Sequence, residues 1–495
     1  MMLTMTKTVN RVIGLVLISG FLSASGTTWA QSLPAEVDVV VVGAGGAGLS
    51  AATTLVQGGK RVIVLEKMPA IGGNTIRSGG FFNAVDPKHE PVMGETDSEA
   101  LYLSQMMKSG GGENTPEVAQ ALVQHTLPTL RWLESLGLKF RQETVAVWGA
   151  EWPRGHKTLE SRGQGYIRVL SAEFLKRGGE IFTQRAVVGL MTDATGRVTG
   201  VKVMATSDLT AGTRQGDRTE TVKAKEAVIL ASGGFGANRA MIEKYAPAWK
   251  GLTTDNNPGN TGDLLPLAQS VGAVLVGLKN VQVVPGSPTG QPFQVRLDLD
   301  VSRSLLLDST GAHLIDEDAP RDQLAQAVVK SQQGKAGRQP VFTLTDQAAV
   351  DSFDVVTRRD VYRGLETGAA FRADTLEALA KLTHMTPSVL VATVDAFNRD
   401  ARGHTGKCAR VQCRPIETAP FWASPVVMSI HSTLGGVKIS PRAEVLDAQG
   451  RPIPGFFAAG EVTGNVHGVN RLGGNGITDA ITFGRIAAET ILTSR

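Results

Sequence analysis

The sequence predicts an α/β protein in which an α+β domain is inserted into a Rossmann-like dinucleotide-binding domain. An apolar run, a glycine-rich turn, a helical stretch and a second apolar run follow one another between residues 37 and 66, in the order of a βαβ unit. This pattern disappears after residue 245, and a strand, a glycine-rich turn and a helix return near the C-terminus. We therefore expect the binding domain over residues 31–245 and 421–495, and a capping or substrate domain over 246–420.

The elements follow in order along the chain. Residues 37–42 read Val-Asp-Val-Val-Val-Val, which is typical of a buried strand in a parallel sheet. An alanine-rich helix over 49–57 ends at Gly58-Gly59, and a second strand covers 61–65. Further elements are expected as helices over 116–136 and 165–177, short strands over 181–230, a hairpin loop over 205–221, helices over 261–272 and 374–400, and a C-terminal helix.

Composition excludes several classes of protein. The chain has 495 residues, of which 42% are hydrophobic and 19% charged, so it can bury a large core and is not globally disordered. Its 57 glycines exceed the usual share of about 7% without a Gly-X-Y period. We expect them at tight turns and where the backbone approaches a ligand.

The N-terminus has the pattern of a secretory signal. Lys7 and Arg11 precede an apolar stretch over 12–22, and small and polar residues lead to Ala30. We expect residues 1–30 to be a signal peptide and the protein to be exported to the periplasm; a buried first helix is the alternative. No later run is long enough to span a membrane. Without these two basic residues the net charge of +4 falls to +2, which gives no case for nucleic acid binding.

Two cysteines, Cys408 and Cys413, are present. They are too few for an iron–sulfur cluster, and no C-x-x-C-H motif attaches a haem. In an exported protein they form either a disulfide or two free thiols.

The glycine-rich turn predicts a dinucleotide site. Residues 43–48 read Gly-Ala-Gly-Gly-Ala-Gly after a strand and before a helix, and Glu66 follows at the end of the second strand. The glycines allow a pyrophosphate to reach the helix N-terminus, where free N–H groups favour an anion. Glu66 would accept the ribose hydroxyls and would repel a 2′-phosphate, so NADP is disfavoured.

Further segments carry a resemblance to a known family. They are Gly72-Gly73-Asn74-Thr75, Ser78-Gly79-Gly80 and residues 459–464, which read Ala-Gly-Glu-Val-Thr-Gly. These segments resemble the flavoprotein of the fumarate reductase and succinate dehydrogenase family, above all its soluble periplasmic branch of flavocytochrome c-type fumarate and urocanate reductases. The likeness covers residues 36–490 and is weak over 281–420.

The resemblance implies an extended FAD. Glu66 would bind the adenosine ribose, Asn74 and Thr75 would lie near the diphosphate, Glu461 near the ribityl chain and Asn475 near the ring. Residues 75–78 lack the histidine that attaches FAD covalently in this superfamily, so FAD is expected to be non-covalent. The other residues that the resemblance assigns to FAD are Gly43, Gly45, Gly46, Ala47, Gly48, Lys67, Gly73, Ser78, Gly79, Gly80, Gly234, Asp263, Gly476 and Ile477.

The same resemblance implies three catalytic residues. His431 lies in a segment similar to the family's His-His-Thr-Met-Gly-Gly, and Arg471 lies in a signature matched almost letter for letter over 466–475. His431 and Arg471 would bind one substrate carboxylate, since a guanidinium offers two parallel N–H donors to its oxygens. Arg321 would then deliver a proton near the double bond while FAD supplies hydride.

Departures from the family pattern change the expected substrate. Val284 stands where the family has a histidine for fumarate's far carboxylate, and burying an unpaired carboxylate there would be costly. We therefore expect an acrylate-type acid rather than fumarate. The family's proton relay behind Arg321 falls on Leu297 and Asp300, so it is missing or rebuilt; Asp298 or Asp300 would be candidates, although surface exposure is the more frequent position for either.

Alternatives stay open. The chain would reduce an α,β-unsaturated carboxylic acid with electrons from a c-type cytochrome or a quinol-linked donor. It would otherwise desaturate a saturated acid or a ketosteroid-like substrate. The ketosteroid reaction needs an acidic tyrosine, and Tyr362 in the inserted domain leaves it open. A non-enzymatic flavin electron carrier is a third reading. His156 would contact the flavin or lie on the surface, and Ser432 replaces the family's second active-site histidine.

Overall fold

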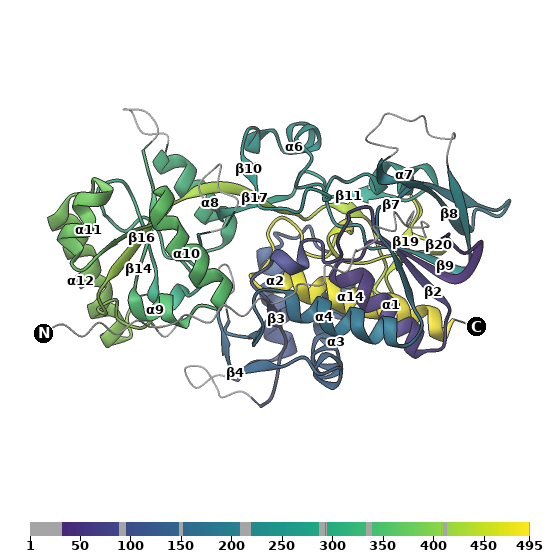
Figure 1. Cartoon of the computed structure of the whole chain (residues 1–495), viewed down its shortest axis with the longest axis horizontal. Coiled ribbons are helices and arrows are strands. Elements are labelled where there is room, and N and C mark those ends of the chain that lie inside the picture. Colours follow the sequence, from purple (N-terminus) through teal and green to yellow (C-terminus); the bar gives the residue numbers. More distant parts are fainter. Residues whose placement is uncertain are drawn as a thin grey trace, which may run out of the picture. The chain divides into compact units, whose positions relative to one another are not determined.

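The main sheet has eight strands, ordered β19-β20-β9-β1-β2-β6 with β8 joined to β9 and β7 to β8 (Figure 1). The computed structural model describes residues 32–88, 96–147, 152–207, 219–286, 293, 295–332, 339–406, 408 and 413–494. The strands of this sheet are β1 (Glu36–Val42), β2 (Val62–Leu65), β6 (Glu180–Phe182), β7 (Arg185–Thr192), β8 (Val198–Ala205), β9 (Glu220–Leu230), β19 (Glu444–Leu446) and β20 (Pro452–Ala458).

The centre of this sheet is parallel and buried. β20, β9, β1, β2 and β6 run in one direction. Val39, Val40 and Val41 of β1 are fully buried, as expected for a β-branched run covered on both faces. The predicted hairpin over 205–221 agrees with the antiparallel pairing of β8 and β9; residues 208–218 lie outside the described residues.

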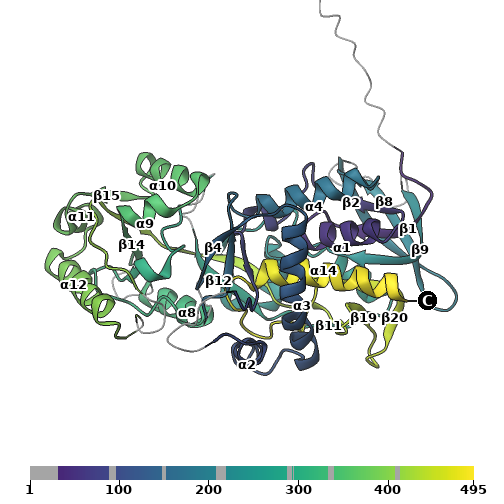
Figure 2. The same ribbon diagram turned by 90° about the horizontal axis from the view of Figure 1, so that it is seen from below.

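Helices pack beside this sheet. α1 contacts α14 and α4, and α14 contacts α3 (Figure 2). A Cβ on Gly484 of α14 would lie 2.3 Å from the Ala47 carbonyl oxygen of α1, so the absence of a side chain there allows the two helices to approach. These helices are α1 (Gly46–Gln57), α2 (Glu99–Ser109), α3 (Pro116–Ser135), α4 (Gln164–Lys176) and α14 (Asn475–Thr493).

A second sheet belongs to the inserted part of the chain. Its strands are ordered β13-β14-β16-β15, and β16 is an inner strand that pairs with both β14 and β15. This sheet therefore extends past the boundary expected at residue 420. The elements of this part are β13 (Leu305–Leu307), α8 (Arg321–Gln332), β14 (Phe342–Asp346), α9 (Gln347–Ser352), α10 (Val355–Thr367), β15 (Phe371–Ala373), α11 (Leu376–Thr383), α12 (Pro387–Gly403) and β16 (Phe421–Pro425).

Three small sheets complete the described fold. They are β10-β17-β12, β11-β18 and β3-β5-β4. In the first of these sheets, β10 and β12 precede the strands of the inserted sheet in the sequence, and β17 follows them. Their strands are β10 (Thr253–Thr254), β12 (Val281–Gly286), β17 (Val427–Thr433), β11 (Leu275–Val276), β18 (Gly436–Val437), β3 (Phe81–Asn83), β4 (Phe140–Val145) and β5 (Gly155–Thr158). The remaining helices are α6 (Arg239–Tyr245), α7 (Leu264–Ser270) and the 3-10 turns η1 (Thr75–Arg77), η2 (Pro247–Trp249), η3 (Val301–Arg303) and η4 (Gly460–Val462).

The structure answers the question left open about the two cysteines. Cys408 and Cys413 are joined by a disulfide with an S–S distance of 2.17 Å, which decides between the alternatives left by the sequence.

Among the described residues, no helix has both the length and the apolar character that crossing a membrane requires. The expected signal peptide, residues 1–30, lies outside the described residues.

Candidate active site

A cavity of about 590 Å³ lies at the carboxyl ends of the parallel strands, where open α/β sheets bind their ligands. Val42, Leu65 and Ala231 line it from β1, β2 and the end of β9. Its wall continues to side chains of β17 and α8. Of the site residues predicted from the sequence, all but Gly48, Gly234 and Asn475 line this cavity.

The glycine-rich turn forms one end of the cavity. Gly43 has a φ of +109°, and a Cβ there would lie 2.3 Å from the Ala231 carbonyl oxygen. A Cβ on Gly48 would lie 1.9 Å from the Gly43 carbonyl oxygen, whereas a Cβ on Gly45 would meet nothing within 4 Å. Gly43 and Gly48 are therefore required by packing, and Gly45 faces open space at the N-terminus of α1. This cradle suits a pyrophosphate, because the helix N-terminus presents free N–H groups.

Glu66 lies at the end of β2, next to the same turn. Its carboxylate accepts hydrogen bonds from the backbone N–H groups of Ala44 at 2.9 Å and Met68 at 2.8 Å. Its neighbour Lys67 binds Thr261 at 2.6 Å and forms an ion pair with Asp263. Lys67 and Asp263, both predicted to bind the cofactor, thus contact each other.

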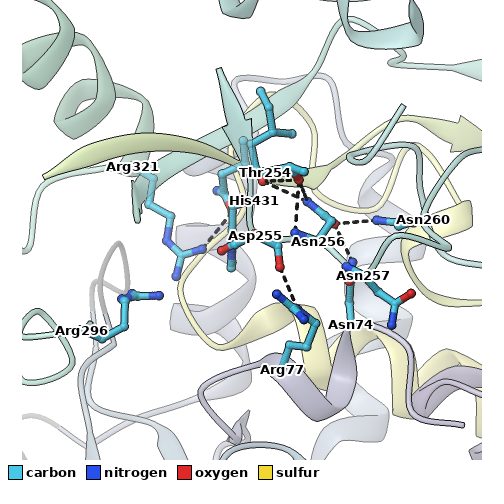
Figure 3. Close-up of polar contacts among 12 residues, drawn as sticks. Asn74, Arg77, Thr254, Asp255, Asn256, Asn257, Asn260, Arg296, Arg321 and His431 are labelled. Carbon is cyan, nitrogen blue, oxygen red and sulfur yellow. Dashed lines mark hydrogen bonds and ion pairs between the residues drawn. The ribbon is translucent and has the colours of Figure 1, made fainter. Parts of the chain in front are cut away.

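An amide and carboxylate network crosses the middle of the cavity. Asn74 donates to Asn256 at 2.6 Å (Figure 3). It also donates to Glu461 at 3.1 Å. Glu461 also accepts from the backbone N–H of Thr433 at 3.0 Å. Gly234 does not line the cavity, but a Cβ there would lie 2.8 Å from the Glu461 carboxylate. Its lack of a side chain leaves room for this network.

The first turns of α14 supply another part of the wall. Gly476, Ile477 and Asp479 line the cavity, whereas Asn475 is buried beneath it and accepts a hydrogen bond from Tyr102 at 2.6 Å. The Oδ1 atom of Asp479 and the Nε atom of Arg471 are buried without a hydrogen-bond partner among the described residues. Because buried polar groups are normally paired, these atoms indicate that a polar ligand belongs here.

The three predicted catalytic residues come from separate elements and lie on one cavity. Arg321 begins α8, His431 is on β17, and Arg471 precedes α14. Gln282 of β12 joins two of them: it accepts from Arg321 Nη1 at 2.9 Å and donates to the Arg471 carbonyl at 2.8 Å. This bridge connects the Arg321 side chain to the backbone at Arg471.

Burial destabilises the positive charge of both arginines, and neighbouring cations add to this effect at Arg321. Burial, followed by the charges of Arg471 and Arg296, lowers the pKa of Arg321 well below its usual value. Burial likewise lowers the pKa of Arg471. Arg321 is therefore a better proton donor in this cavity than a solvent-exposed arginine.

The sequence left Asp298 as a relay candidate or, more often for this residue type, a surface carboxylate, and the surface position is wrong. Asp298 is buried and accepts two hydrogen bonds from Arg296, on Oδ1 from Nε at 2.6 Å and on Oδ2 from Nη2 at 2.5 Å. Arg296 lines the cavity near Arg321 (Figure 3). Asp300 instead caps η3 by accepting from the backbone N–H of Ser302 at 3.0 Å. Leu297 is buried in an apolar cluster.

Asp255 was missed altogether. It lines the cavity, and its Oδ2 atom lies 2.8 Å from His431 Nδ1. Arg77, also overlooked, lines the cavity and donates to the Asp255 backbone carbonyl at 2.9 Å. No motif marks these residues, since each acts through a partner distant in sequence.

Several weaker expectations are also settled by position. Val284 is buried and lines the cavity, as does Ser432. His156 is buried on β5, with Nε2 3.6 Å from Asp86, and is neither at the surface nor among the described residues that line the cavity. Tyr362 is 39% exposed and packs on Trp422. None of the four tyrosines, all within the described ranges, lines the cavity, so the acidic tyrosine of the desaturase reading is absent from it.

Comparisons with known proteins identify the family of this chain. Residues 38–477 match the family described as an FAD binding domain. The chain is 34% identical, over 92% of its length, to a fumarate reductase (cytochrome) of Shewanella frigidimarina, of which it covers 76%. It is 32% identical, over 93% of its length, to an NADH:acrylate oxidoreductase of Vibrio harveyi, of which it spans about half, 51%.

A solved structure gives the same fold. The open conformation of a flavocytochrome c3 fumarate reductase superposes with a TM-score of 0.68 at 30% identity, covering 92% of this chain and 78% of the other. The resemblance, the fold class and the FAD cofactor expected from the sequence are thereby confirmed.

Proposed function

This chain belongs to the fumarate reductase-like family of FAD-dependent oxidoreductases, and on that premise we propose that it reduces the C=C bond of an α,β-unsaturated monocarboxylic acid. One observation carries the proposal: two arginines and a histidine converge on a cavity whose wall also contains the apolar Val284. When bound, FAD supplies the hydride for the β-carbon. FAD is proposed to be non-covalent.

Arg471 and His431 would bind the substrate carboxylate. A carboxylate paired with cations withdraws electrons from the adjacent double bond and favours hydride addition at the β-carbon. Arg321 would donate a proton to the α-carbon, so that one hydride and one proton saturate the bond. The lowered pKa of Arg321 supports this role, because an arginine in water is too weak an acid.

Arg321 must recover its proton, and Arg296 with Asp298 is proposed to provide it. Asp298 is buried and bonded to Arg296, which lines the cavity. Although burial opposes it, the charge of Asp298 raises the pKa of Arg296, so Arg296 is protonated at rest. It would pass its proton to a neutral Arg321 and regain one from solvent through Asp298. These residues replace a relay that would otherwise fall on Leu297 and Asp300.

The far end of the substrate is proposed to be apolar or neutral. Val284 and Leu299 line the cavity, and neither can hydrogen-bond a second carboxylate. Arg296, a cation that lines the same cavity, is already paired with Asp298. A monocarboxylate therefore fits better than fumarate.

Electrons are proposed to come from a c-type cytochrome or a quinol-linked donor in the periplasm, after export by the signal peptide. The desaturase reading lacks a cavity tyrosine among the described residues, and the electron-carrier reading leaves Arg321, His431 and Arg471 without a purpose. Reduction thus accounts for more of the site than either alternative.

A dye assay tests the substrate. We expect reduced methyl viologen to be reoxidised at least tenfold faster by acrylate or cinnamate than by fumarate. Val284→His should raise the rate with fumarate relative to acrylate, because it restores a donor for a second carboxylate. Val284→Leu is the control for bulk and should leave fumarate a poor substrate. Rapid turnover of fumarate by the unmodified enzyme would contradict the proposal.

A further inference from the structure

Asp255 and His431 are brought together by the register of two strands. β10 pairs in parallel with β17, with Thr254 opposite Ile430. Asp255 directly follows Thr254 at the end of β10, and His431 follows Ile430 on β17. The Oδ2 atom of Asp255 lies 2.8 Å from the Nδ1 atom of His431. Figure 3 shows this contact beside the Arg77 side chain, which donates to the Asp255 carbonyl.

The contact decides which nitrogen of His431 carries a proton. An ionised carboxylate can only accept hydrogen bonds, so Nδ1 is the donor to Asp255. In the neutral ring, Nε2 then has a lone pair and is an acceptor. A substrate carboxylate is also an acceptor, so neutral His431 cannot donate a hydrogen bond to it from Nε2. Such a bond requires the protonated ring.

The surroundings keep that ring neutral until an anion arrives. Burial lowers the pKa of His431, Asp255 raises it, and the positive charges of Arg321 and Arg471 lower it further. The net shift is downward. Other charged groups that line the same cavity include Arg77 on η1, Arg296 after β12, Glu461 on η4, and Asp479 on α14. A carboxylate beside Arg471 and His431 would offset the positive charge of the arginines and favour the imidazolium.

We propose that carboxylate binding in this cavity is coupled to the uptake of one proton by His431, and that Asp255 is the positioning residue that makes this coupling possible. The inference rests on the proposed function, since it takes the His431 and Arg471 side chains as the carboxylate site. The proton on His431 stays there through the reaction. It is distinct from the proton that Arg321 gives to the α-carbon, so the overall hydride and proton balance is unchanged.

A dependence of affinity on pH follows. Above the pKa of His431 in the free enzyme, each unit of pH removes nine tenths of the protonated form, so the dissociation constant for a carboxylate rises tenfold per unit. Below that pKa the dissociation constant does not change with pH. The substrate-bound enzyme retains the proton to higher pH, so kcat changes less than KM over this interval.

Calorimetry on the oxidised holoenzyme measures the coupling without turnover. Acrylate is titrated between pH 7 and 8.5 in phosphate and in Tris, whose ionisation enthalpies differ, and the difference in binding heat gives the number of protons taken up. We expect a value near one. A value near zero with normal binding would overturn the inference, and this result needs no variant protein.

Two variants identify the residues involved. Asp255→Asn keeps an acceptor for Nδ1 but removes the charge, so it should weaken acrylate binding at pH 7.5 by about tenfold and shift the onset of the pH dependence to lower pH. His431→Gln offers an amide donor at every pH, so its weaker binding should not depend on pH. An Asp255→Asn protein that retains wild-type affinity at every pH would show that Asp255 has no such role.

The outcomes separate this inference from the proposed function. Asp298→Asn removes a carboxylate near Arg321 rather than beside His431, so it should lower the rate of reduction while leaving proton uptake near one. If no enoate is reduced but carboxylate binding still takes up a proton, the proposed function fails and the inference stands. If enoates are reduced and binding takes up no proton, the inference alone fails.

Discussion

At the scale of single residues, two carboxylates compete for the role of proton relay, and the structure separates them. Asp298 is buried against Arg296, whereas Asp300 is bonded to the backbone of η3. We expect Asp298→Asn to lower kcat by about a hundredfold, the usual scale of general acid–base catalysis, with little change in KM and a larger solvent isotope effect. Asp300→Asn is the control and should affect neither. A loss of rate in Asp300→Asn alone would assign the relay to the other carboxylate.

The sequence identified residues that lie in contiguous motifs and missed those that depend on tertiary pairing. His431 and Arg471 are flanked by glycine-rich signatures, so their presence on the cavity could be expected. Asp255 reaches His431 through the register of a two-residue strand, β10, which is too short to produce any periodic pattern. Asp298 was expected at the surface because most aspartates are exposed; its pairing with Arg296 is what permits burial.

At the scale of elements, the glycine turn between β1 and α1 combines two different requirements. Gly48 is needed because a Cβ would collide with the Gly43 carbonyl at 1.9 Å, whereas a Cβ on Gly45 would meet nothing within 4 Å. We expect Gly45→Ala to fold with the wild-type melting temperature as apoprotein but to lose FAD affinity, because its methyl group occupies cofactor space. Gly48→Ala should lower the melting temperature of the apoprotein by several degrees.

Differential scanning fluorimetry on apoprotein and FAD titration of each variant distinguish the two effects. Equal melting temperatures for the two apoproteins would contradict the division of roles.

Periodicity predicts these elements well, since the valine run of β1 and the helix after it have strong local patterns. β16 begins just past the boundary expected at residue 420 and joins the inserted sheet through pairing with β14 and β15, which local sequence does not encode.

At the scale of the whole molecule, ion pairs connect the inserted part to the dinucleotide-binding part. Asp360 on α10 is buried and pairs with Arg162, which precedes α4, at 2.9 Å, and with its own neighbour Arg359 at 3.0 Å. A second contact joins Lys157 on β5 to Asp354, the N-cap of α10, at 3.8 Å. The Arg162–Asp360 pair crosses between the parts, whereas the Arg359–Asp360 pair lies within α10.

The two arginines that pair with Asp360 can be removed separately. Arg162→Ala should weaken the contact between α10 and the binding domain by about 1 kcal/mol, the upper range for partly exposed pairs, and so raise KM for an enoate roughly fivefold and speed hydrogen exchange in α10. Arg359→Ala removes an arginine from the same carboxylate without touching the binding domain and should change neither quantity. Equal effects of the two substitutions would mean that Asp360 stabilises α10 alone. Faster exchange and a higher KM in Arg162→Ala alone would mean that this ion pair helps to hold the inserted part over the cavity, where water must be excluded from the reduced cofactor.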